Sequence, residues 1–116
     1  MGEPVMYIIA NKSLGMSLGK LAAQVSHAAV KAYLLSELKI REEWDSGSYA
    51  KIILGAKDEA ELKNIGDNLY AANLNVWLVR DEGRTEIEPG SITALAVEIV
   101  DKEKYKYIFS KYSLFS

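Results

Sequence analysis

The chain contains no cysteine, two prolines and a single histidine in 116 residues. Without cysteine, the protein has no disulfides, thiol nucleophiles or thiolate metal sites. A metal site would need mainly carboxylate ligands, and no such spacing stands out, so we expect neither metal nor cofactor. A Ser-His-Asp triad would have to use His27, and the Gly-x-Ser-x-Gly motif is missing, which argues against a covalent serine enzyme.

Long hydrophobic runs are also missing. The first apolar run, Met6–Ala10, is about one strand long and Lys12 follows it soon after, so it is neither a signal peptide nor a membrane span. Because 49% of the residues are hydrophobic, the chain can form one core. We therefore expect residues 1–116 to form a single cytoplasmic domain that does not bind membranes.

The charge pattern is uneven. The net charge of -2 argues against binding nucleic acid over the whole surface, because phosphate binding needs clustered Lys and Arg. No acidic residue lies between Glu3 and Glu37, a stretch that contains Lys12, Lys20, His27 and Lys31. This predicts a local basic face; chance spacing of charges is the alternative.

Apolar patterning predicts strands at Met6–Ala10, Lys51–Ala56, Val76–Arg80 and Ile92–Val100. Helices are predicted from the Ser17 cap to about Leu38, from Glu59 to about Ala72, and from near Asp101, with Arg41–Tyr49 as a polar connection. This alternation predicts an α/β fold, a three-layer α/β/α sandwich. No helix separates the last two strands, so they can be antiparallel neighbours in a four-stranded mixed sheet. Ligands are expected in the loops after Ala10 and Arg80.

The start of the first long helix is the first candidate site. At about 100° per residue, Lys20, Gln24, His27 and Lys31 fall within a stripe roughly 60° wide, which predicts a mostly buried helix with one narrow polar seam. Lys20 lies in the first turn, where the helix dipole disfavours a cation by up to about 1 kcal/mol, so something should compensate. With Gly15 and Gly19 permitting close backbone approach, the segment predicts an anion site. A solvated face is the alternative.

The nucleotide-binding P-loop is the obvious comparison for this segment, and it fails twice. Three residues separate Gly15 from Gly19 where the P-loop has four, and Leu21 follows Lys20 where a hydroxyl should bind magnesium. A P-loop-like nucleotide-binding protein stays a minor alternative.

The second candidate site follows the third strand. Asp81 stands at its carboxyl end, before Glu82-Gly83-Arg84-Thr85-Glu86. A carboxylate, a guanidinium and a hydroxyl together can order a water, bind a phosphate or a ribose, and supply a general base. A polar turn with a surface ion pair is the alternative.

Together, MSLGKLAAQVSHAAV and LVRDEGRTEIEPGSITALAV resemble the type II peptidyl-tRNA hydrolases, and the resemblance extends roughly from Tyr7 to Val97. It implies a compact α/β sandwich, often dimeric, that works in the cytosol without a metal. It implies hydrolysis of the ester between a peptide and the 3′ ribose of tRNA, with peptidyl-tRNA as the partner and a homodimer as the expected assembly. The chain departs from the family pattern at Asn11, Ser13 and Glu82.

The resemblance also implies site residues. As catalytic residues it gives Lys20, which would stabilise the oxyanion or bind the terminal nucleotide, Asp81 and Thr85, which would orient or deprotonate the water, and His27. Gln24 would position this network with His27, and Arg84 would hold tRNA phosphate or ribose. The expected substrate-binding set is Gln24, Gly83, Arg84, Gly19 and Lys12.

Two other functions stay open. The first is a noncatalytic RNA-binding module that retains the same fold, which would bind tRNA without releasing peptide. The second is partner binding through the aromatic residues between Tyr105 and Phe115. Packing of these residues over a sheet edge is the simpler expectation.

Overall fold

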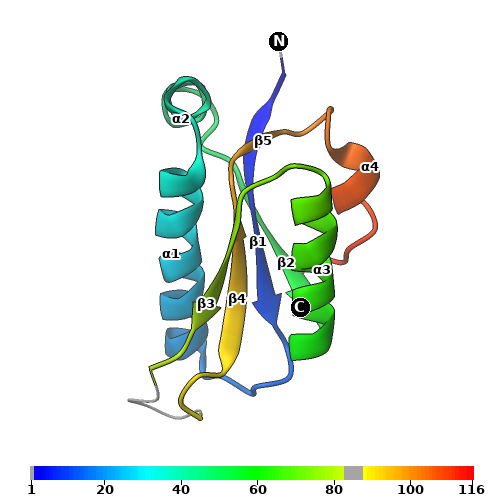
Figure 1. The fold of residues 1–116 in the computed structure, drawn as a ribbon. Coiled ribbons are helices and arrows are strands. Elements are labelled where there is room, and N and C mark those ends of the chain that lie inside the picture. Colours follow the sequence, from blue (N-terminus) through cyan, green and yellow to red (C-terminus); the bar gives the residue numbers. More distant parts are fainter. Residues whose placement is uncertain (1, 83–87) are drawn as a thin grey trace.

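A sheet lies between two helical layers, which confirms the predicted α/β sandwich (Figure 1). The computed structural model describes residues 2–82 and 88–116. The strand order is β2-β1-β4-β3. β1 (Pro4–Asn11) is parallel to β2 (Lys51–Ala56) and antiparallel to β4 (Ile92–Val97). β3 (Val76–Arg80) is antiparallel to β4, so the sheet is mixed, as predicted.

A fifth strand departs from the prediction of four. The expected strand Ile92–Val100 is interrupted after Val97. At this point the Glu98 carboxylate accepts the Asn75 N–H at 2.6 Å and the Glu98 N–H donates to the Asn75 carbonyl at 3.0 Å. The chain then continues as β5 (Val100–Asp101), which pairs with the first residues of β1.

The helix α1 (Leu18–Leu35) ends earlier than predicted and is less buried. Its end is fixed by the buried Ser36 hydroxyl, which donates to the Ala32 carbonyl at 2.7 Å and accepts the Ile99 N–H at 2.8 Å. The prediction of a mostly buried helix is wrong. Only one side of α1 faces the sheet, whereas Leu18 is 86% and Val30 61% exposed.

A second helix, α2 (Leu38–Ser46), occupies much of the predicted polar connection Arg41–Tyr49. Two apolar residues one turn apart, Ile40 and Trp44, attach it to the sheet. Trp44 is buried, and its indole N–H donates to the Ala50 carbonyl at 2.8 Å. Tertiary packing therefore stabilises a helix that its mostly polar sequence does not suggest.

The opposite face of the sheet is covered by α3 (Glu59–Ala71) and the short α4 (Lys106–Phe109). The Asp58 cap is confirmed, because its carboxylate accepts the Glu61 N–H at 2.8 Å. The predicted last helix starts later than Asp101 and is short. Phe109 stacks on Tyr7 with ring centroids 4.0 Å apart, so the aromatic tail packs on its own chain.

Small side chains bring α1 close to the sheet. Ala28 and Ala32 of α1 are fully buried against a cluster that contains Ala94 and Ala96 of β4. Because these residues lack bulk, the helix backbone can approach the sheet closely. The helix α1 thereby lies beside β3 and β4 (Figure 1).

Candidate active site

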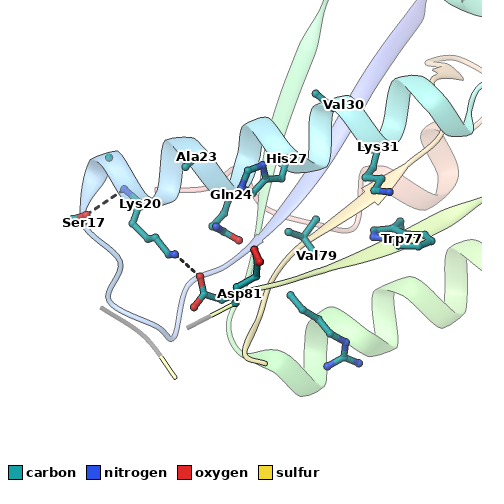
Figure 2. Close-up of a pocket in the computed structure, with 13 residues that line it drawn as sticks. Ser17, Lys20, Ala23, Gln24, His27, Val30, Lys31, Trp77, Val79 and Asp81 are labelled. Carbon is teal, nitrogen blue, oxygen red and sulfur yellow. Dashed lines mark hydrogen bonds and ion pairs between the residues drawn. The ribbon is translucent and has the colours of Figure 1, made fainter. Parts of the chain in front are cut away.

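A pocket of about 860 Å³ lies between α1 and the end of β3. Its lining includes the four polar residues that were predicted to share one helix face, Lys20, Gln24, His27 and Lys31 (Figure 2). The predicted alignment is therefore confirmed. Gln24 is only 4% exposed, which argues against the alternative of a simple solvated face.

The two candidate sites meet in an ion pair. The Lys20 ammonium donates to the Asp81 carboxylate, and the two side chains are only 12% and 3% exposed. Figure 2 shows this contact at one end of the pocket. The helix dipole disfavours the Lys20 charge in the first turn of α1, and the Asp81 carboxylate offsets this effect. A carboxylate near a helix start also interacts favourably with the dipole.

The backbone of Asp81 is fixed on both sides. Its N–H donates to the Ser91 carbonyl at 2.8 Å, and its carbonyl accepts the Gly90 N–H at 2.8 Å. Gly90 has φ of 84°, a conformation that glycine adopts without strain. The carboxylate is therefore held from a rigid strand end, which favours a precise orientation in the pocket.

Gln24 is positioned by a residue that the sequence interpretation missed. The buried Thr93 hydroxyl donates to Gln24 Oε1 at 2.6 Å. Thr93 is the extra residue in an irregularity of the β3–β4 pairing, where Val79 pairs with Ala94 and Arg80 with Ile92. Such a bulge redirects a side chain, and here the Thr93 hydroxyl reaches Gln24 on α1.

The remaining predicted residues divide into three groups. Gly19 lines the pocket, and a Cβ built on it would meet no atom within 4 Å. Lys12 does not line the pocket; its stem lies against Gly55 of β2, so the structure gives no support to its binding role. Gly83, Arg84 and Thr85 lie outside the described residues.

Asn11 has a structural role. It is 2% exposed, its Nδ2 donates to the Ile92 carbonyl at 2.9 Å, and its Oδ1 accepts the Ser13 N–H at 2.9 Å. Asn11 thus ties the end of β1 to β4, and neither Asn11 nor Ser13 lines the pocket.

The lining also contains residues that were not predicted as site residues, among them Trp77, Val79 and Arg80. The sequence does contain a signal that could have placed Trp77 in the pocket. Side chains alternate along a strand, so residues 77, 79 and 81 share one face, and Trp77, Val79 and Asp81 all line the pocket.

Two groups with shifted pKa values, Tyr7 and Glu59, lie outside the pocket. Burial raises the pKa of the Tyr7 phenol above its usual value, and the Glu3 charge adds to this. The Ile92 N–H and Lys63 lower the pKa of Glu59 on α3. Within residues 2–82 and 88–116, no cluster of three or more His, Asp or Glu side chains is arranged to hold a metal ion.

The sequence matches the family model "Peptidyl-tRNA hydrolase PTH2" over residues 4–115. The chain belongs to this family. The resemblance predicted from the two motifs is thereby confirmed, and the match extends beyond them to nearly the whole chain.

Relatives with the family's name support the assignment. The peptidyl-tRNA hydrolase of Haloquadratum walsbyi is 34% identical over 108 residues, which cover 93% of this chain and 96% of the relative. That of Methanococcus maripaludis is 38% identical over 101 residues, or 84% of this chain and 86% of the relative. The mouse protein "Peptidyl-tRNA hydrolase 2, mitochondrial" is 38% identical over 109 residues, or 87% of this chain but only 60% of the relative.

Proposed function

We propose that the chain hydrolyses the ester bond between a peptide and the 3′ end of tRNA in the pocket between α1 and β3. The observation that carries this proposal is the ion pair of Lys20 with Asp81, which joins the two motifs of the family in one pocket. The family assignment supports the substrate class. The buried carboxylate and ammonium support the chemistry, because ester hydrolysis needs a base for water and a positive charge for the oxyanion.

Each residue of the Lys20–Asp81 ion pair has its own role in the reaction. A water attacks the ester carbonyl carbon, and the Asp81 carboxylate accepts a proton from that water. The carbonyl oxygen becomes an oxyanion, which the Lys20 ammonium stabilises. The bond from carbon to the ribose oxygen then breaks, and the ribose oxygen takes up the proton from Asp81. The products are a peptide with a free carboxyl group and a tRNA with a free 3′ hydroxyl.

The neighbouring residues position this pair. Thr93 fixes Gln24 Oε1, which leaves the Gln24 amide nitrogen as the donor toward the ligand. His27 lines the same wall one turn further along α1. Thr85 and Arg84 keep the roles that the resemblance implies, the orientation of the water and the binding of phosphate or ribose.

The test is release of peptide from purified peptidyl-tRNA. Lys20→Ala and Asp81→Asn should each lower turnover by about 10² to 10⁴, the usual effect of losing an oxyanion donor or a general base. Because the two groups act as a unit, the double variant should lose about as much as either single variant. Lys63→Ala is the matched control, since Lys63 forms a half-exposed pair with Glu59 on the other face of the sheet.

Folding and turnover must be separated. Removing one partner of a buried pair leaves an uncompensated charge, which is destabilising, so circular dichroism accompanies each assay. The double variant removes both charges and should fold better than Lys20→Ala. Wild-type rates in both single variants would refute the assignment, whereas salt-dependent tRNA binding without peptide release by the wild type would indicate a binding module. A parallel arm with a chelator should leave turnover unchanged.

We also propose that the chain forms a homodimer. Large apolar side chains that α1 leaves exposed support it, with Leu34 58% exposed and Leu18 86% exposed. Sedimentation at two concentrations should show a concentration-dependent dimer, and Leu34→Glu should weaken it. A single monomeric species at both concentrations would refute the dimer.

For the compartment we propose the cytoplasm. None of the helices in residues 2–82 and 88–116 is long and apolar enough to cross a membrane. The relative from mouse has a name that places it in mitochondria, so cell fractionation with compartment markers is the deciding measurement. Recovery with the mitochondrial fraction would overturn the proposal.

A further inference from the structure

The pocket continues beyond His27, away from the ion pair. At its far end Lys31 of α1 points toward Trp77 of β3 (Figure 2), and Val30 also lines the pocket. Lys31 stands eleven residues after Lys20 in the same helix, which at 1.5 Å per residue places it about 16 Å along the helix axis. This end is therefore too distant for Lys31 or Trp77 to contact the reacting ester.

Trp77 contributes little to the core. It is 49% exposed and belongs to neither of the two apolar clusters, whereas Val79 on the same strand face is only 6% exposed. The Lys31 ammonium lies 4.3 Å from the centroid of the Trp77 ring, a cation–π contact. An indole left open on a pocket wall, next to a cation, is typical of sites that bind nucleotides of single-stranded nucleic acid.

We propose that Trp77 and Lys31 form a nucleotide-binding subsite for the single-stranded 3′ end of the tRNA. The inference rests on the proposed function and adds a residue that determines how the substrate is held. The base stacks on the indole in the place that the ammonium occupies. The flexible stem of Lys31 lets the ammonium move to the adjoining phosphate.

The distance and the charges favour a nucleotide upstream of the ester. The distance of about 16 Å, estimated from the helix rise of about 1.5 Å per residue, exceeds the reach of the terminal nucleoside alone. The pocket lining carries Lys20, Lys31 and Arg80 against Asp81 and Glu82, and Asp81 is paired with Lys20. A wall of this kind suits a phosphate backbone better than an uncharged peptide.

Tryptophan fluorescence tests the subsite directly. The chain has two tryptophans, and Trp44 is only 3% exposed and stacked on Tyr49. Quenching by the trinucleotide CCA, the sequence that ends tRNA, should therefore report on Trp77. We expect saturable quenching in the wild type and none in Trp77→Phe. Lys31→Ala should weaken binding and make it less sensitive to salt.

Kinetics on two substrates separate the subsite from the chemistry. Trp77→Ala should raise KM for peptidyl-tRNA about 5- to 10-fold with kcat unchanged, the lower range for loss of one stacked base. Trp77→Phe should restore most of this loss. On the same acyl group esterified to a lone adenosine, Trp77→Ala should behave as wild type. Tyr70→Ala is the control, because Tyr70 is an exposed aromatic, 72% exposed, on α3.

The outcomes distinguish the two proposals. Hydrolysis of peptidyl-tRNA without quenching by CCA would overturn the subsite alone. An equal rise in KM on both substrates would also overturn it, because the indole would then contact the peptide or the terminal nucleoside. Quenching by CCA in a wild-type protein that hydrolyses neither substrate would overturn the proposed function and leave a nucleotide-binding site.

Discussion

The hydrogen bond from Thr93 to Gln24 links the bulge in the sheet to the pocket wall, and Thr93→Val removes it with almost no change in shape. Thr93 is 0% and Gln24 4% exposed, and the donor–acceptor distance is 2.6 Å. The substitution leaves a buried amide oxygen without its donor, which costs about 1–3 kcal/mol. Burial of the additional valine methyl offsets part of this free-energy cost. We expect a net loss of about 1–2 kcal/mol in the free energy of unfolding.

The same substitution should affect catalysis. Once the Gln24 side chain is no longer held, it can rotate in the pocket, and a displacement of about 1 Å near reacting groups can cost up to about 10² in rate. Turnover of peptidyl-tRNA should therefore fall between about 10- and 100-fold, more than the stability loss alone explains. Urea unfolding gives the stability change, and steady-state kinetics at a temperature well below the transition gives the turnover.

Thr93→Ser is the matched control. It keeps the hydroxyl and removes one methyl, so it should lose stability through the small cavity and keep most of the turnover. A double-mutant cycle with Gln24→Ala measures the coupling between the two side chains, expected at about 0.5–3 kcal/mol for residues in contact. Wild-type stability and turnover in Thr93→Val, or a loss of turnover in Thr93→Ser of the same size, would refute the positioning role.

Two further predictions concern the rest of the fold. Asp58→Ala removes the cap of α3, whose carboxylate accepts the Glu61 N–H. Urea unfolding should show that Asp58→Ala lowers the free energy of unfolding by about 1 kcal/mol, whereas Asp58→Asn should keep most of the wild-type stability. The raised pKa of Tyr7, due first to burial and then to the Glu3 charge, means that the folded chain holds the phenol proton more tightly than the unfolded chain. Its contribution is therefore complete below about pH 10, the pKa of an unfolded tyrosine, and is lost as the pH rises through the higher folded pKa. Tyr7→Phe should flatten this alkaline loss in unfolding measurements, and an unchanged pH dependence would contradict the assignment.

Periodicity was sufficient for the parts of the site that depend on regular elements. The 3.6-residue repeat placed Lys20, Gln24, His27 and Lys31 on one helix face, and the rule for open α/β sheets placed Asp81 near a ligand. Both placements depend only on local geometry and element order. The pocket that these residues line confirms the shared helix face; ligand binding beside Asp81 stays a prediction.

The features that could not be predicted depend on contacts between elements. The β3–β4 bulge at Thr93 has no sequence signature of its own, since it arises from how two strands pair. The helix α2 depends on the burial of Trp44 against the sheet. The depth of α1 was misjudged because its apolar residues are distributed on all sides, and composition does not say which side meets the sheet.

The last residues of the chain also affect whether one molecule can pair with another through the edge of its sheet. Leu114 bridges Leu54, the Phe115 N–H donates to the Ile53 carbonyl at 2.9 Å, and the Gly55 N–H donates to the Ser113 carbonyl at 3.0 Å. These bonds occupy the outer edge of β2, which would otherwise offer unpaired backbone groups to a second molecule. Removal of residues 113–116 should therefore promote aggregation through edge-to-edge strand pairing. For the same reason, an affinity tag placed directly after Ser116 should carry a flexible spacer.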